Sequence, residues 1–205
     1  MEQFYEKDKI EVGIDEAGRG CLFGPVSIAA VIWPQEEPNP DIIIRDSKKM
    51  TERQKNIAYE YIMNNSIDVS HKFIDHDEID KTNILKSTLK GMHLCLDDIT
   101  KDHDIDTILV DGNQFEFYCD NNDNYLNHVC IINGDNRYRS IACASIIAKV
   151  NRDNYIKQLC EENPELKEYD IHNNKGYGTT RHLAAIKEYG ITKWHRKTFG
   201  ICKEY

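Results

Sequence analysis

Patterns that would place the protein in a membrane or a secretory pathway are missing from the sequence. No eighteen apolar residues run together, so a membrane span is not expected. The polar opening Met1-Glu2-Gln3 leads to a first apolar run only at about Ile10, and no signal-peptide core is found. We therefore expect a soluble, intracellular protein of the cytoplasm, without a membrane partner.

The cysteines do not form any Cys-x-x-Cys pair, which argues against a zinc site or a redox dithiol. The seven cysteines are odd in number and scattered along the chain, at positions 21, 95, 119, 130, 143, 160 and 202. Reduced thiols are the expected state in a cytosolic protein. Internal repeats, low-complexity tracts and flexible linkers are also missing.

Cations are outnumbered by acidic residues overall but are concentrated near the C-terminus. The chain has 26 Lys and Arg residues against 35 Asp and Glu residues, a net charge of −9, which argues against indiscriminate nucleic-acid binding. Residues 172–205 nevertheless carry a net charge of +5, which leaves −14 for the rest. We expect this segment to contact a nucleic-acid backbone; its cations are Lys175, Arg181, Lys187, Lys193, Arg196, Lys197 and Lys203. A second basic cluster consists of Arg45, Lys48, Lys49, Arg53 and Lys55.

The length of 205 residues, with 40% hydrophobic content, suggests one α/β domain over residues 1–205 that ends in a basic helical segment at about 172–205. Alternation and β-branched runs predict strands at 12–14, 26–33, 67–74, 105–110 and 128–133. Helical spacing predicts helices from the Thr51 cap to residue 65, then at 83–99, 141–160 and 180–188. Strands first, then alternating elements, then helices indicate a mixed central sheet flanked by helices.

The most informative stretch is residues 12–20, Val-Gly-Ile-Asp-Glu-Ala-Gly-Arg-Gly. Asp15 and Glu16 offer hard oxygen ligands for a divalent cation, and Arg19 adds a permanent positive charge. Gly18 and Gly20 lack a Cβ, so the backbone there could approach a phosphate or a sugar closely. A lone Asp-Glu pair is more often a charged turn, but the Gly-Arg-Gly continuation favours a site.

Further carboxylates follow other predicted strands. Asp111 ends the strand at 105–110, and Asp135 follows the strand at 128–133, so both could meet Asp15 and Glu16 at one edge of the sheet. Such oxygen ligands suit Mg²⁺ or Mn²⁺. Neighbouring strand side chains point to opposite faces, so either the strand breaks at Glu16 or one of Asp15 and Glu16 binds through its carbonyl.

Several ordered blocks resemble the type 2 ribonucleases H, ribonuclease HII. The first is the stretch just described, followed by Gly24-Pro25-Val26. The others are Asp46-Ser47-Lys48-Lys49, Leu109-Val110-Asp111-Gly112-Asn113, Gly134-Asp135, the run from Ala144 to Asp153, and Lys175-Gly176-Tyr177-Gly178-Thr179 with His182 beyond. Two stretches depart from the family pattern, Cys21-Leu22-Phe23 and residues 114–128, and neither touches a position expected to do chemistry.

The resemblance implies a ribonuclease H-like fold and a metal-dependent endoribonuclease. Such an enzyme hydrolyses the RNA strand of RNA–DNA hybrids and nicks DNA 5′ of an embedded ribonucleotide, leaving 3′-hydroxyl and 5′-phosphate ends. It implies two metal ions, Mg²⁺ or Mn²⁺, a monomer, and roles in ribonucleotide removal and RNA primer processing. The implied catalytic, metal-binding acids are Asp15, Glu16, Asp111 and Asp135.

The resemblance also implies which groups read the substrate. Gly18, Arg19, Gly20 and Tyr177 would sense the ribose 2′-hydroxyl, which distinguishes RNA from DNA. Ser47, Lys48 and Lys149 are candidate phosphate contacts. We expect His182 and His195 to be structural and Asp153 to be a salt-bridge partner.

Three other hypotheses remain at this stage. Ribonuclease HIII would need an extra N-terminal domain and a glutamate as the fourth acid, whereas about ten residues precede the first expected strand and the fourth acid is Asp135. A non-catalytic hybrid-binding module would not need all four acids. An acidic cation-binding protein would have no use for the basic C-terminal segment or for Tyr177.

Overall fold

A mixed β-sheet forms the centre of the protein. The computed structural model describes residues 1–39, 41–120 and 122–205, and within them the strand order is β3-β2-β1-β4-β6-β5. The strands are β1 (Glu11–Ala17), β2 (Val26–Ile32), β3 (Asp68–Ile74), β4 (Thr107–Asp111), β5 (Tyr118–Cys119) and β6 (Tyr125–Ile131). The pairs β1–β2, β2–β3 and β5–β6 are antiparallel, whereas β1–β4 and β4–β6 are parallel.

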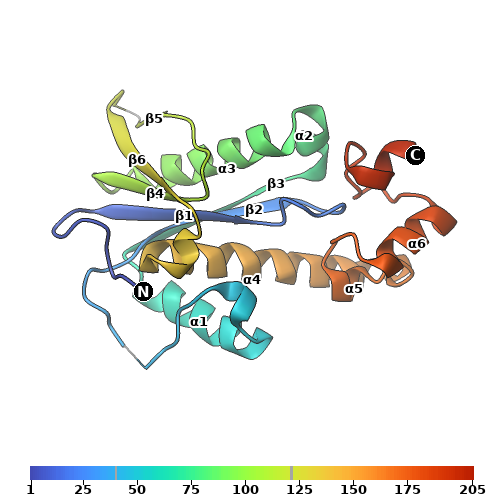
Figure 1. The fold of residues 1–205 in the computed structure, drawn as a ribbon, viewed down its shortest axis with the longest axis horizontal. Coiled ribbons are helices and arrows are strands. Elements are labelled where there is room, and N and C mark those ends of the chain that lie inside the picture. The colour runs from blue at the N-terminus through green and yellow to red at the C-terminus, as the bar shows by residue number, and fades with distance from the viewer. Residues whose placement is uncertain (40, 121) are drawn as a thin grey trace.

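Helices cover both faces of this sheet (Figure 1). The α-helices are α1 (Glu52–Asn65), α2 (His76–Lys81), α3 (Ile84–Ile99), α4 (Arg139–Glu162), α5 (Ile171–Asn174) and α6 (Thr180–Tyr189). Short 3-10 turns are η1 (Ser47–Lys49), η2 (Gly134–Asn136), η3 (Pro164–Lys167) and η4 (Gly200–Glu204). Helices α2 and α3 lie on one face, and α4 and α1 lie on the other, while α5, α6 and η4 gather beyond one end of the sheet.

Strand β2 explains why the sheet is covered on both sides. All seven of its residues are buried, because Ile28 and Ala30 face the α3 side whereas Ala29 and Val31 face the α4 side. On β1, Gly13 lets α4 approach closely, since an added Cβ would lie 2.3 Å from the carbonyl carbon of Ser140. Helix α4 is thereby packed closely against β1, the strand that carries Asp15 and Glu16.

The predicted elements at 26–33, 51–65, 67–74, 83–99, 105–110, 141–160 and 180–188 are confirmed to within a few residues. Thr51 caps α1 through a reciprocal capping box with Gln54. The strand predicted at 128–133 corresponds to β6, but β6 begins at Tyr125 and ends at Ile131, and Ile132 is 67% exposed. Helices α2 and α5 and strand β5 were not predicted. No helix in the described residues is long and apolar enough to span a membrane.

Candidate active site

The candidate site opens where two neighbouring strands stop pairing. Strand β1 pairs with β2 as far as Ala17, but its parallel pairing with β4 ends at Ile14 and Val110. Asp15 and Glu16 therefore follow the last residue of β1 that pairs with β4, and Asp111 is the last residue of β4. Of the two alternatives given for Asp15 and Glu16, a break of the strand at Glu16 is not found, since the β1–β2 register continues through it.

A cavity of about 230 Å³ lies at this opening. It brings together every site residue proposed from the sequence except Asp135, and it adds Ala17 and Ser145. The lining residues are Asp15, Glu16, Ala17, Gly18, Arg19, Gly20, Ser47, Lys48, Asp111, Ser145, Lys149 and Tyr177. Segments far apart in sequence thus meet in one place.

Among the acids that line the cavity, Asp15 has the most strongly raised pKa. It is only 6% exposed; its Oδ1 accepts a hydrogen bond from the Glu16 N–H at 2.7 Å, and Ser145 supplies a side-chain hydrogen bond. Burial, then the charges of Glu16 and Asp111, raise the pKa of Asp15 well above its usual 3.8. No cation among the described residues lies within 4 Å of this carboxylate.

The pKa values of Glu16 and Asp111 are also raised. Burial is the main cause for Glu16, although Arg19 Nη1 lies 3.3 Å from its Oε1 and opposes the shift. For Asp111 the causes are burial and then the charge of Asp135. Asp111 Oδ1 accepts a 2.7 Å hydrogen bond from the Gly134 N–H, so this carboxylate ties the end of β4 to the turn that carries Asp135.

Asp135 lies beside the cavity rather than in its lining. It is the second residue of η2, which begins directly after the left-handed residue Asn133, and it is only 3% exposed. Lys48 Nζ approaches Asp135 Oδ2 at 3.9 Å from an 81% exposed side chain. The charge of Asp135 therefore acts on Asp111, and the exposed Lys48 approaches Asp135 from the solvent side.

The chemistry of this donor set fits a divalent cation. Buried carboxylates whose mutual repulsion raises their pKa values are stabilised when a hard cation binds between them. Among the described residues, no three acidic, His or Cys side chains are already grouped closely enough to enclose a metal ion. Asp15, Glu16 and Asp111 share one opening with Asp135 beside it, and coordination would require these side chains to turn toward a common point.

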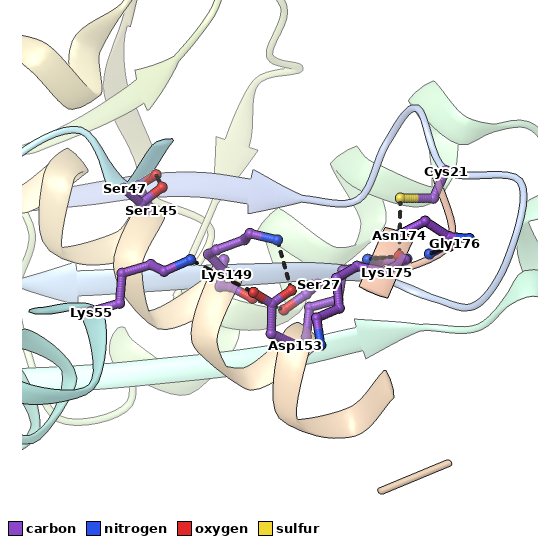
Figure 2. A network of polar contacts seen from close by, with 12 residues as sticks. Cys21, Ser27, Ser47, Lys55, Ser145, Lys149, Asp153, Asn174, Lys175 and Gly176 are labelled. Atoms are coloured by element: carbon purple, nitrogen blue, oxygen red, sulfur yellow. Dashed lines mark hydrogen bonds and ion pairs between the residues drawn. The ribbon is translucent and has the colours of Figure 1, made fainter. Parts of the chain in front are cut away.

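The three phosphate-contact candidates differ in accessibility. Ser47 is 5% exposed, and its Oγ lies 3.2 Å from Ser145 Oγ, so the hydroxyl is engaged with α4 (Figure 2). Lys149 Nζ bonds Asp153 Oδ1 at 2.7 Å, and Lys55 Nζ lies 3.8 Å from Asp153 Oδ2. Asp153 is thus confirmed as a salt-bridge partner. Of the two cations among these candidates, Lys48 is the more exposed, with 81% of its side chain accessible against 24% for Lys149.

The Gly-Arg-Gly turn depends on a different set of contacts from those expected. Gly18 has φ +90°, and an added Cβ would lie 2.0 Å from Arg152 Nε, so this glycine is required by internal packing. A Cβ on Gly20 would meet nothing within 4 Å. The missing Cβ of Gly18 is thus explained by packing alone, whereas the open space beside Gly20 leaves room for a ligand.

Two buried arginines hold this turn from below. Arg196 donates to the carbonyls of Gly18 and Arg19, both at 2.8 Å, and to that of Gly24 at 2.9 Å. Burial lowers the pKa of Arg196 to about 10, which leaves it a cation at neutral pH. Arg196 was counted from the sequence among the backbone-binding cations of residues 172–205; its exposure of 0% corrects that assignment.

A relay of hydrogen bonds connects the C-terminal segment to Tyr177. The Thr192 N–H donates to His195 Nδ1 at 2.9 Å, so the neutral His195 carries its proton on Nε2 and donates to His182 Nε2 at 3.0 Å. His182 then donates from Nδ1 to the Tyr177 carbonyl at 2.9 Å. Both histidines are fully buried, which agrees with their expected structural role, and Tyr177 remains 43% exposed at the cavity.

Sequence reasoning missed Ser145, Arg152 and Arg196 as parts of this site. Ser145 stands among small apolar residues in α4, and a single hydroxyl in such a run is a sequence signal that could have identified it. Arg152 lies within Asn151-Arg152-Asp153, where a role was predicted from the sequence only for Asp153. Its guanidinium instead donates to the carbonyls of three residues distant in sequence, Phe23, Pro25 and Lys175. No local sequence pattern predicts the role of Arg196.

Comparisons with known proteins show the family of the chain. The chain matches the family model described as Ribonuclease HII over residues 12–202. Ribonuclease HII of Christiangramia forsetii is 44% identical over 203 residues, covering 98% of this chain and 96% of that protein.

Solved structures support the fold. Ribonuclease H2 from Pyrococcus horikoshii matches with a TM-score of 0.72 at 22% identity, covering 95% of both chains. The structure of Bst-RNase HIII in complex with Mn²⁺ matches with a TM-score of 0.65 at 18% identity, covering 89% of this chain and 63% of that one. The sheet and its flanking helices therefore form a ribonuclease H-like fold. With the family match over residues 12–202, this makes the protein a metal-dependent ribonuclease H that acts on RNA–DNA hybrids, and the chain belongs to the ribonuclease HII family.

Proposed function

We propose that this enzyme, beyond cleaving RNA–DNA hybrids, incises duplex DNA on the 5′ side of a single embedded ribonucleotide. The observation that supports this is the single cavity lined by Asp15, Glu16 and Asp111 together with the turn at residues 18–20 and Tyr177. Acids able to hold metal ions and groups able to sense a ribose therefore face the same small volume. A site for one ribonucleotide needs both within one nucleotide's reach.

The proposed metal ligands are the carboxylates of Asp15, Glu16, Asp111 and Asp135. These four residues would hold a pair of divalent ions, whose Lewis acidity would favour attack by water and stabilise the leaving oxygen of a phosphodiester. The oxygen donor set suits Mg²⁺ or Mn²⁺, and the Bst-RNase HIII structure named above holds Mn²⁺. Ser145, which gives the Asp15 side chain a hydrogen bond, would help to hold this carboxylate in place for a metal ion.

The remaining lining groups bind and orient the substrate. The exposed Tyr177 and the backbone of residues 18–20 would contact the ribose, and its 2′-hydroxyl can both donate and accept a hydrogen bond. Lys48 and Lys149 would neutralise phosphates beside the incision point, and Ser47 would donate a hydrogen bond there. Incision with a 3′-hydroxyl and a 5′-phosphate as products follows from attack of water on the phosphorus with departure of the 3′ oxygen.

In the cell, the proposed roles are removal of ribonucleotides from DNA and processing of RNA primers. Both tasks present a junction where a ribose is followed by a deoxyribose, which is the substrate that a ribose-sensing cavity selects. We propose that the protein acts as a monomer in the cytoplasm, on hybrids and on duplex DNA that contains ribonucleotides.

The test is cleavage of a DNA duplex with one ribonucleotide, in Mg²⁺ or Mn²⁺, with analysis of the product ends. Asp111→Asn removes a charge from the acid cluster and should lower kcat about a thousand-fold, because metal-assisted charge stabilisation is worth several kcal/mol. Asp106→Asn, just before the other end of β4, is the matched control and should keep its activity. Cleavage of a long hybrid without incision at the single ribonucleotide would refute the proposal.

A further inference from the structure

Two fully buried arginines lie beneath the candidate site without a carboxylate partner. Arg152 and Arg196 are both 0% exposed, and in the described part of the chain no acidic oxygen lies within 4 Å of either guanidinium. Each donates instead to three backbone carbonyls. A buried cation satisfied only by carbonyls fixes the backbone conformation of the segments that supply them.

The carbonyls held by Arg196 determine where the amides of the turn point. Arg196 Nη2 and Nη1 bind the oxygens of Gly18 and Arg19, each at 2.8 Å. In a planar trans peptide the N–H is directed opposite to the C=O, so the amides of Arg19 and Gly20 face away from the buried guanidinium. Among the described residues no acceptor is bonded to either amide.

These two free amides lie on residues that line the cavity. Successive N–H groups with a common direction make a site for an oxygen with negative charge or a lone pair. The guanidinium on the far side of each peptide also polarises it, which strengthens the N–H as a donor. Arg196 therefore fixes the turn through its carbonyls and leaves the Arg19 and Gly20 N–H groups available to a ligand.

We propose that Arg196 is a positioning residue for ribonucleotide recognition, which aims the Arg19 and Gly20 amides at the substrate's ribose or adjacent phosphate. This rests on the proposed incision at single ribonucleotides. Arg152 supports the same turn, because its guanidinium occupies the position where a Gly18 side chain would stand, and it holds the Lys175 carbonyl at 2.7 Å, two residues before Tyr177.

Lysine cannot substitute for arginine in this role. The guanidinium presents donors in a fixed planar fork, and Arg196 uses Nε, Nη1 and Nη2 for three different carbonyls. An ammonium group at the end of a flexible chain would satisfy them incompletely and would leave the turn free to rotate. The substitution Arg196→Lys therefore keeps the charge and removes the geometry.

The experiment compares the wild-type enzyme with Arg196→Lys and with Leu166→Ala. Leu166 is fully buried in a hydrophobic cluster that includes Leu159 and Ile186, and it does not line the cavity. Its truncation is therefore the control for simple loss of stability. The readouts are Tm, Mn²⁺ affinity, and kcat/KM on a single-ribonucleotide duplex and on the same duplex with 2′-fluoro or 2′-deoxy sugar at that position.

We expect Arg196→Lys to lower kcat/KM for the ribonucleotide about 10- to 100-fold, as removal of a residue that orients binding groups commonly does. Its preference for ribose over the modified sugars should fall with it, while Mn²⁺ affinity stays unchanged. Leu166→Ala should lower Tm and keep the sugar preference. An unchanged sugar preference in Arg196→Lys, or an equal change in both variants, would overturn the proposal.

A second measurement separates this proposal from the proposed function. In ¹⁵N-labelled protein, Arg196→Ala should shift the Arg19 and Gly20 amide resonances and alter their hydrogen exchange, and millimolar methylguanidinium should restore both. If the wild type cleaves hybrids but ignores single ribonucleotides, the proposed function fails, and these resonances still decide whether Arg196 positions the turn. Unperturbed Arg19 and Gly20 resonances would refute the positioning role itself.

Discussion

The acidic edge of the cavity and the turn beside it both contain buried charge, but they satisfy it differently. Asp15, Glu16 and Asp111 repel one another, and burial together with this repulsion raises their pKa values. Arg152 and Arg196 carry the opposite sign and are bonded to backbone carbonyls throughout their guanidinium groups. One region is incomplete without a cation, whereas the other is complete within the folded chain.

This difference distinguishes ligand-binding charge from structural charge. A buried ion whose hydrogen-bonding capacity is filled by the protein contributes to geometry, and removal of a partner is costly. A buried ion that lacks partners favours binding of a counter-charge and destabilises the empty protein. The acids and the arginines should therefore respond in opposite directions to substitution, pH and metal.

The largest effect is expected from Gly18→Ala, which intrudes on the arginine-held turn. The new Cβ would stand 2.0 Å from Arg152 Nε, and the backbone φ of +90° is unfavourable for alanine. Backbone strain and overpacking together should destabilise the protein by about 3 kcal/mol or more. Urea unfolding of the variant measures this.

Gly20→Ala is the matched control on the same turn. Its Cβ would meet nothing within 4 Å, so its free energy of unfolding should stay within about 0.5 kcal/mol of the wild type. Equal destabilisation by the two alanines would mean that the turn is not held in the manner described. A fall in ribonucleotide incision by Gly20→Ala without loss of stability would place the ligand on that side.

The acids of the site were predictable because each follows an apolar run that sequence periodicity identifies as a strand. Asp15 and Asp111 lie at the ends of runs that are buried on both faces, and such runs have an unambiguous pattern. Strand β6 is different: several of its residues are only partly buried, and the exposed Ile132 extended the apolar run beyond the true end at Ile131. Hydropathy alone could not locate that boundary.

The arginine-held turn could not be predicted in the same way. Arg196 reaches Gly18 across 178 positions, and its partners are backbone carbonyls, which every residue possesses. A contact that uses no special partner leaves no sequence pattern. Arg196 was therefore counted with the solvent-facing cations of the basic segment, and only the fold distinguishes it from its neighbours there.

An intermediate effect is expected from acid on the histidine relay of the C-terminal segment. Burial, then the neighbouring His182, lowers the pKa of His195 from its usual 6.5 to about 3, and burial lowers that of His182 also. The unfolded chain takes up protons below pH 6.5, whereas the folded chain does so only near pH 3. Stability is thus fully present above pH 6.5 and is lost as the pH falls, by on the order of 2 kcal/mol at pH 5 for His195.

Urea unfolding at pH 7 and pH 5, in chelator, measures this loss. His195→Gln removes the titrating ring, so the variant should lose less stability than the wild type over the same interval. If both proteins lose the same amount, His195 is not buried in its neutral form. The cavity acids have raised pKa values, so their contribution to stability grows as the pH falls. Repeating the comparison in Asp15→Asn protein removes the contribution of Asp15.

The smallest effect, of opposite sign, is expected from Asp15→Asn in metal-free protein. Because the pKa of Asp15 is raised above 3.8, the folded chain binds the proton more tightly than the unfolded chain does. Stability therefore falls as the pH rises from 3.8 through the folded-state pKa of Asp15. Neutralising the side chain should therefore stabilise the protein at pH 7 by about 1 kcal/mol. The gain should vanish below about pH 4, where the unfolded carboxyl is also protonated.

Asp106→Asn gives the comparison its control. The Ile10 N–H at 2.9 Å and Lys9 Nζ at 3.0 Å lower the pKa of Asp106, so its ionised form is satisfied in the fold. This carboxylate contributes stability above its unfolded pKa, and Asp106→Asn should destabilise the protein at pH 7. Added Mg²⁺ should raise the Tm of the wild type and of Asp106→Asn, and raise that of Asp15→Asn less. Equal gains in all three proteins would mean that the cation binds away from the acids, and the cavity would then be no metal site.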